Sequence, residues 1–95
     1  MSVTVRVPTI LRTYTDGASE VSVDVADGAT LSDVIDSLES AHPGIKGRVL
    51  DDSGALRRFV NVYVGDEDVR FIDGLGTPVA DGASVSVIPA VAGGC

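Results

Sequence analysis

The sequence has no tryptophan and only one methionine, one lysine and one cysteine, and these scarcities exclude several classes of protein. A single cysteine can form no internal disulfide, and it cannot supply the four thiolates of a ferredoxin-type iron–sulfur cluster. No apolar run approaches the roughly 20 residues of a membrane span, and the first residues lack the basic and apolar regions of a signal peptide. We therefore expect a cytoplasmic protein that binds no metal and no cofactor of its own.

Basic residues are also few, because seven Lys and Arg stand against 14 Asp and Glu, for a net charge of −7. A negative field of this kind repels the phosphates of nucleic acids and of anionic lipids. We therefore expect neither nucleic acid nor membrane as a partner, whereas a basic protein surface would be attracted. The need to keep a small protein soluble explains the acidity equally well.

Valine is abundant and alternates with polar residues in four segments, 3–7, 21–25, 60–64 and 85–87. A period of two predicts strands with one buried face, and valine is well suited to them. A polar loop around Asp16-Gly17 joins the first two segments, which predicts an antiparallel hairpin. A further short strand is expected around Val69 and Phe71.

One helix is predicted between the second and third strands. Thr30 is a favourable N-cap, and Asp33 three residues later resembles the second member of a capping box. The following apolar residues have helical spacing and end before Pro43-Gly44, a helix stop: Leu31, Val34, Ile35 and Leu38. Five strands and one helix in this order predict an α+β fold in which the helix covers one face of a mixed sheet.

The final six residues, Ala90-Val91-Ala92-Gly93-Gly94-Cys95, have the pattern of neither strand nor helix. We therefore divide the chain into a domain at 1–89 and a flexible tail at 90–95. Five extended residues reach roughly 16–18 Å, enough to place a terminal carboxylate inside another protein. Glycine has no Cβ and can pass through a narrow channel. A frayed chain end would look the same, so the tail alone does not decide.

Three blocks resemble the ThiS/MoaD family of ubiquitin-like sulfur carriers. They are residues 8–12 (PTILR), 58–71 (RFVNVYVGDEDVRF) and 81–94 (DGASVSVIPAVAGG). The likeness extends over essentially the whole chain and is greatest to the carriers of a cysteine-biosynthesis route. It implies a β-grasp (ubiquitin-like) fold with a Gly-Gly tail.

The resemblance also implies a function, that of a sulfur carrier protein which is not itself an enzyme. In this family, an ATP-dependent E1-like activating enzyme adenylates the terminal glycine carboxylate, here that of Gly94 after Gly93. A sulfur donor then displaces AMP and leaves a thiocarboxylate. In the cysteine-forming branch, this sulfur adds to an aminoacrylate on a pyridoxal-phosphate-dependent cysteine synthase, and a JAMM-type zinc metalloprotease releases the cysteine.

Several alternatives stay open at this point. Other family members give sulfur to thiamin, molybdopterin or secondary-metabolite synthesis, and some are tightly bound small subunits of a synthase. A ubiquitin-like domain can also be a non-catalytic interaction module whose tail is never activated.

Cys95 departs from the family pattern, because it blocks the carboxylate of Gly94. Three interpretations are open: an encoded extension that a protease removes, the carrier–cysteine adduct of the pathway, or a residue left by protein production. A redox or metal role is disfavoured, since a lone terminal thiol has no neighbouring ligands.

A surface for docking partners is expected beside the tail. Phe59 and Tyr63 share the outward parity of their strand, and Ile88 interrupts the outward polar residues of the last strand. The predicted docking residues therefore run from these strands into the tail: Phe59, Tyr63, Ile88, Pro89, Ala90, Val91 and Ala92. Single apolar residues on a surface are common, however.

Two groups of residues that could hold a metal ion or act as a base are expected to have structural roles instead. The carboxylates at 66–68 are expected to diverge in a solvated loop and not to form a metal site. His42, beside Pro43, is expected at the end of the helix and not as a base or ligand.

Overall fold

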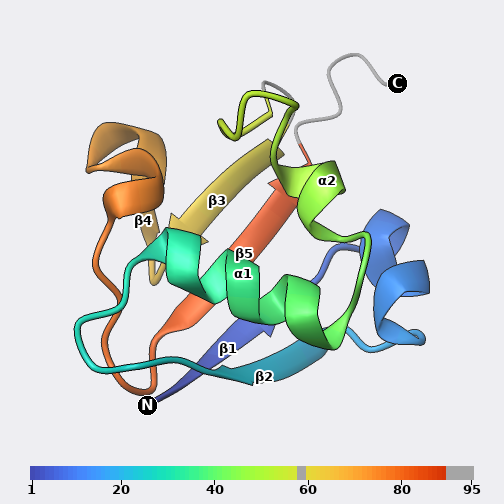
Figure 1. Cartoon of the computed structure of the whole chain (residues 1–95), viewed down its shortest axis with the longest axis horizontal. Helices are drawn as coiled ribbons and strands as arrows, with labels where there is room; N and C mark the ends of the chain where they lie inside the picture. The colour runs from blue at the N-terminus through green and yellow to red at the C-terminus, as the bar shows by residue number, and fades with distance from the viewer. Residues whose placement is uncertain (58–59, 90–95) are drawn as a thin grey trace.

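The alternating valine segments form a five-stranded mixed sheet, and one long helix lies across one of its faces (Figure 1). The computed structural model describes residues 1–57 and 60–89, so Phe59 and the predicted tail at 90–95 lie outside the described residues. The strands lie in the order β2-β1-β5-β3-β4. In chain order, the strands and helices are β1 (Ser2–Arg6), β2 (Glu20–Asp24), α1 (Leu31–Ala41), α2 (Lys46–Val49), β3 (Val60–Val64), β4 (Glu67–Asp68) and β5 (Ser84–Pro89).

The first two strands form the predicted antiparallel hairpin. Val3 pairs with Val23, and Val5 pairs with Val21. Val3, Val5 and Val23 are buried beneath the helix, whereas the residues between them face solvent. The alternation in the sequence therefore identified the buried face of the hairpin correctly.

Helix α1 begins and ends where its sequence signals predict. The Asp33 carboxylate accepts the Thr30 N–H at 2.9 Å, which satisfies one of the free donors at the helix start. His42 is the C-cap, directly before Pro43. The helix buries its predicted apolar stripe, namely Leu31, Val34, Ile35 and Leu38.

Strand β5 lies in the middle of the sheet, although it is the last strand in the chain. It runs parallel to β1, with Val5 beside Val85, and antiparallel to β3, with Val62 beside Val87. Figure 1 shows β5 between these two strands, beneath α1. The β3 side of β5 is therefore paired from Val85 to Pro89, and its β1 side is paired from Ser84 to Ser86.

The connections are more regular than the sequence predicted. The polar loop after β1 contains the 3-10 helix η1 (Thr9–Thr15), and the segment after Gly44, for which no helix was predicted, contains α2. The prediction of a single helix is therefore incomplete. These turns are too short for a periodic apolar pattern, and α2 even contains Gly47, which disfavours helix formation.

The segment after β3 also differs from the prediction. Glu67 and Asp68 pair with β3 as β4 and do not form a loop, since Gly65 takes the positive φ of 63° required by the two-residue hairpin. The predicted short strand around Val69 and Phe71 is instead the 3-10 helix η2 (Val69–Phe71). Asp68 caps it by accepting the Arg70 N–H at 2.9 Å.

The turn after α1 is held by one carboxylate, that of Glu39. It accepts the backbone N–H of Gly44 at 2.9 Å and that of Lys46 at 2.9 Å. The Gly44 hydrogen bond, followed by that of Lys46, lowers the pKa of Glu39 below its ordinary value of 4.5. The charged form of Glu39 therefore connects α1 to α2.

This turn should make stability depend on pH. Because folding lowers the pKa of Glu39, its carboxylate stabilises the fold above pH 4.5, and this contribution is lost as the pH falls through the lower folded value. We expect Glu39→Gln to reduce the free energy of unfolding at neutral pH, and the difference from wild type to shrink below pH 4.5. Urea unfolding at a series of pH values measures this, and a difference independent of pH would contradict it.

Candidate functional site

The site begins where β5 ends, because the predicted tail is joined directly to Pro89. Gly65 donates its N–H to the Ser84 C=O at 2.8 Å, and Thr4 donates to the Ala83 C=O at 3.0 Å. Since backbone groups alternate in direction along a strand, Val85, Val87 and Pro89 direct theirs towards β1. Strand β1 ends at Arg6 and does not reach Pro89. The missing N–H of this proline therefore removes no hydrogen bond from the sheet.

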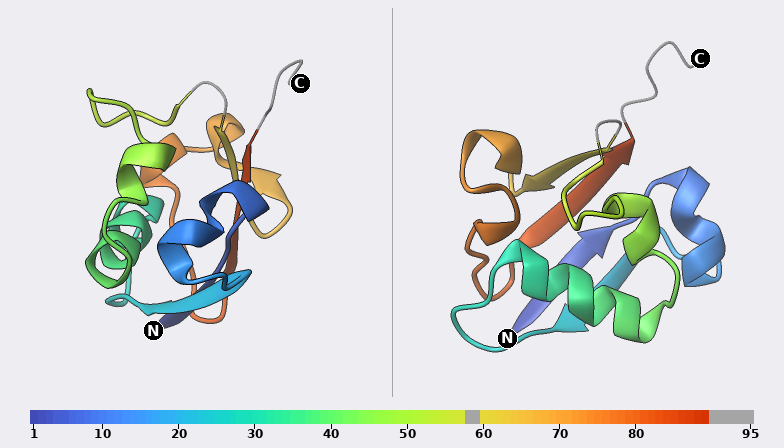
Figure 2. Two further views of the ribbon diagram at one scale, coloured as in Figure 1. Left: turned by 90° about the vertical axis from the view of Figure 1, so that its right-hand side faces the viewer. Right: turned by 45° about the horizontal axis from the view of Figure 1, so that its top comes forward.

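The early end of β1 leaves a shallow pocket beside the end of β5. Figure 2 shows β5 continuing past the tip of β1, which turns away into η1. The pocket has a volume of about 320 Å³. It is lined by Arg6, Val7, Pro8, Ser86, Val87 and Ile88.

Two of the predicted docking residues lie on the same face of the sheet. Tyr63 pairs with Ser86 across β3 and β5, and Ile88 follows Ser86 on the same side of β5. Ile88 is 46% exposed. Pro89 is the last residue of β5, whereas Phe59, Ala90, Val91 and Ala92 lie outside the described residues, as do Gly93, Gly94 and Cys95. The structure therefore brings Tyr63 and Ile88 together and does not test the other predicted docking side chains.

Arg6 is a member of this face that the sequence did not predict. It lies beside Ser86 in the parallel pairing of β1 with β5, and it contacts Glu20 on β2 at 3.4 Å. We call Arg6, Tyr63, Ser86 and Ile88 the exit face. Arg6 lies there because of how β1 is aligned with β5. The sequence around Arg6 does not show that alignment, so the sequence analysis could not find it.

Arg70, from η2, holds the segment that leads into β3. Its guanidinium donates to the C=O of Arg57 at 2.6 Å, to the C=O of Val60 at 2.7 Å and to the Asn61 side chain at 2.7 Å. Val60 is opposite Pro89 in the sheet. Arg70 therefore fixes the strand that supports the end of β5.

The described residues offer little chemistry of their own. In 1–57 and 60–89, no group of three His, Cys, Asp or Glu side chains is placed to hold a metal ion. The helices of the same ranges include none that is long and apolar enough to cross a membrane. The exit face combines one cation, two hydroxyl groups and an exposed isoleucine, an arrangement suited to contact with another protein.

Known proteins resemble this chain over nearly its full length. A sequence model of the ThiS family matches residues 5–94. The chain is 56% identical over 96 residues to the sulfur carrier protein CysO of Mycobacterium tuberculosis, covering 99% of this chain and 100% of that protein. The crystal structure of that protein matches with a TM-score of 0.84, covering 94% of this chain and 99% of the other.

Two further crystal structures are similar. One is the BexX/CysO complex of Amycolatopsis orientalis, with 50% identity, a TM-score of 0.86, and 94% of this chain and 96% of that chain covered. The other is SAMP1 of Haloferax volcanii, with 31% identity, a TM-score of 0.80 and 94% of both chains covered. These matches confirm the predicted β-grasp fold.

The contacts of Arg70 give a testable prediction about the support of β5. Arg70→Met keeps much of the side-chain length but removes three charge-assisted hydrogen bonds, so we expect a loss of about 1–2 kcal/mol in unfolding free energy. Amide hydrogen exchange should also become faster at Asn61 and Ile88. Arg6→Met, which removes one exposed ion pair, is the control and should cost less than about 0.5 kcal/mol. Equal effects of the two variants on exchange and stability would contradict the role of Arg70.

Proposed function

Because this chain belongs to the ThiS family and is a sulfur carrier protein, we propose that Gly94 is the residue that bears the sulfur once Cys95 has been removed. The family match ends at Gly94 and leaves Cys95 outside it. The observation that carries the proposal is the position of β5, whose end leads from the exit face directly into the tail.

The proposed chemistry takes place in partner enzymes. An oxygen of the Gly94 carboxylate attacks the α-phosphate of ATP in the active site of an E1-like activating enzyme, and pyrophosphate leaves. A sulfur donor then attacks the acyl carbon, AMP leaves, and a thiocarboxylate is formed. Activation is needed because a carboxylate is a poor electrophile. The carrier acts as a co-substrate. We propose that this chemistry takes place in the cytoplasm, because it needs ATP and a reduced sulfur donor.

The activating enzyme binds the carrier through its folded domain. The tail from Ala90 to Gly94 spans roughly 16–18 Å when extended, so its end can enter an active site while residues 1–89 stay outside. Glycine at 93 and 94 allows passage through a narrow channel. The exit face lies where such an enzyme would meet the domain, and Ile88 supplies an exposed apolar contact.

We assign the sulfur to cysteine formation, because the protein that is 56% identical is named CysO. The acceptor would then be a pyridoxal-phosphate-dependent cysteine synthase, and a JAMM-type zinc metalloprotease would release the product or trim Cys95. Acceptors in thiamin, molybdopterin or secondary-metabolite synthesis are the alternatives. The acceptor enzyme makes this choice, and a transfer assay with each one distinguishes them.

Intact mass spectrometry tests the position of the sulfur. The full chain is incubated with ATP, a sulfur donor, the activating enzyme and the metalloprotease, and each is omitted in turn. We expect loss of one cysteine residue, followed by the mass change of replacing one oxygen with sulfur.

A chain that already ends at Gly94 is the matched substrate, and it should gain sulfur without the protease. If the chain that ends at Gly94 gains no sulfur with an activating enzyme that adds sulfur to a known carrier, the proposal is wrong. The remaining interpretation is then an interaction module whose tail is not activated.

The exit face is tested separately by charging kinetics. Ile88→Asp places a charge at the expected apolar contact and should raise the KM for the carrier about tenfold or more, with little change in kcat. Ile72→Asp is the matched control, because Ile72 is similarly exposed at 42% but lies beyond η2. Equal KM values for the two variants would contradict docking through the exit face.

A further inference from the structure

The two edges of the sheet differ in how they are covered. At one edge, β4 pairs with the end of β3. Near the beginning of β3, the Arg70 guanidinium donates to the C=O groups of Arg57 and Val60. At the other edge lies β2, and among residues 1–57 and 60–89 its one strand partner is β1. An uncovered edge strand can accept a further strand, and proteins usually cover or blunt such edges.

The hydrogen bonds to β1 identify which groups of β2 face outward. Met1 and Val25 exchange N–H···O=C bonds at 2.8 and 2.9 Å, and Val7 donates to Ser19 at 2.8 Å. Because hydrogen-bonded and non-hydrogen-bonded residues alternate along an antiparallel pair, the backbone N–H and C=O groups of Glu20, Ser22 and Asp24 point away from β1. Within 1–57 and 60–89, the N–H and C=O of Ser22 have no hydrogen-bond partner, and the C=O of Asp24 accepts only the Ser37 hydroxyl, at 3.1 Å.

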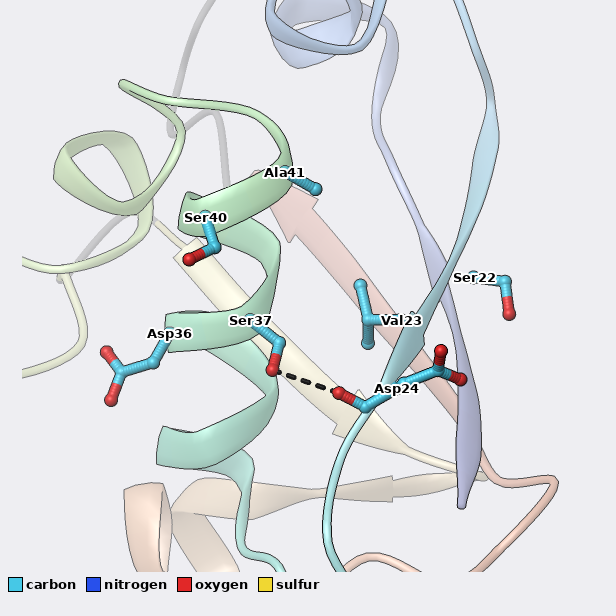
Figure 3. Close-up of a pocket in the computed structure, with 7 residues that line it drawn as sticks. All are labelled: Ser22, Val23, Asp24, Asp36, Ser37, Ser40 and Ala41. Atoms are coloured by element: carbon cyan, nitrogen blue, oxygen red, sulfur yellow. Dashed lines mark hydrogen bonds between the residues drawn. The ribbon is translucent and has the colours of Figure 1, made fainter.

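A groove runs beside this edge, between β2 and α1. Its main part has a volume of about 590 Å³ and lies between the Ser22–Asp24 stretch and Asp36, Ser37, Ser40 and Ala41 (Figure 3). Figure 3 shows the Ser22 and Asp24 side chains pointing away from α1, whereas Ser37 reaches the edge from the helix. An added strand would therefore place alternate side chains against the helix and against the outer face of β2.

Aspartates lie on both sides of the groove, and Figure 3 shows the Asp24 and Asp36 carboxylates at its two rims, turned outward. A second hollow shares Asp24, Asp36 and Ser37 with the first and extends it. The residues lining the two include four aspartates, 24, 27, 33 and 36, and neither lysine nor arginine. Lys46 contacts Asp36 from outside the groove at 2.5 Å, and Arg6 contacts Glu20 on the outer face.

We propose that the β2 edge binds an extended, lysine- or arginine-rich segment of a partner protein, which adds to the sheet as a sixth strand. Main-chain hydrogen bonds to Ser22 and Asp24 would give affinity, and the surrounding carboxylates would select basic side chains. This surface is two strands away from β5, so it could be occupied while the exit face and tail engage an activating enzyme.

A second copy of this chain is a poor occupant of the same edge. Its β2 would bring Glu20 and Asp24 against the same acidic residues, and each copy carries a net charge of −7. Like charges placed opposite one another destabilise strand pairing. The acidic edge therefore disfavours self-pairing and favours a basic strand.

The test uses a blocked octapeptide of alternating lysine and valine, with a glutamate–valine octapeptide as the control probe. Binding to the full chain is followed by amide shifts and hydrogen exchange in NMR. We expect the lysine peptide alone to bind, with the largest changes along β2 and the facing side of α1, and slower exchange at Ser22.

Two charge variants separate strand addition from general attraction. Asp24→Asn with Asp27→Asn should weaken lysine-peptide binding about fivefold, as expected for two exposed ion pairs. Asp52→Asn with Asp66→Asn makes the same change in net charge at exposed sites outside the groove, and should weaken it much less. No binding, shifts centred on another surface, equal weakening by both double variants, or self-association through β2 would each overturn the proposal. Sulfur loading at Gly94 is measured independently, so failure here leaves that assay unaffected.

Discussion

The pairing of β5 with both β1 and β3 joins the two hairpins, β1–β2 and β3–β4, into one sheet. It brings the last strand of the chain to the middle of the sheet, with Val85 and Val87 buried beneath α1. An edge strand could fray together with its terminus, whereas β5 is held on both sides until β1 ends. The position of Pro89 relative to the domain is therefore fixed, so a partner enzyme that binds the domain, as proposed, would also position the start of the predicted tail.

The functions of the domain and the tail can be separated in this arrangement. In the proposed function, the domain contributes the exit face around Ile88 and the acidic edge at β2, and the glycine carboxylate that would carry the sulfur lies beyond the domain. Such a division explains why the carrier can lack a catalytic centre. It also explains why the core is built almost wholly of aliphatic residues, since the core has only to keep the sheet rigid.

Local patterns in the sequence were sufficient for the periodic elements and insufficient for what depends on register. Valine alternation and the Thr30–Asp33 cap predicted four strands and α1, because each signal lies within its own element. Arg6 lies beside Ser86, and Arg70 donates a hydrogen bond to the Val60 C=O. Both contacts join residues that are apart in the chain, so no local pattern predicted them. Short turns such as α2 and η2 carry too few residues for a period. The Gly-Gly assignment came from resemblance, and the structure describes none of those residues.

Under the proposed function, the folded domain, and not the tail sequence alone, presents Gly94 to the activating enzyme. The most direct measurement compares kcat/KM for adenylation of a chain ending at Gly94 with that of a synthetic peptide of residues 85–94. We expect kcat/KM for the peptide to be lower by about a hundredfold or more, because the peptide lacks Arg6, Tyr63 and the sheet that orients Ile88. Equal values for peptide and protein would contradict it.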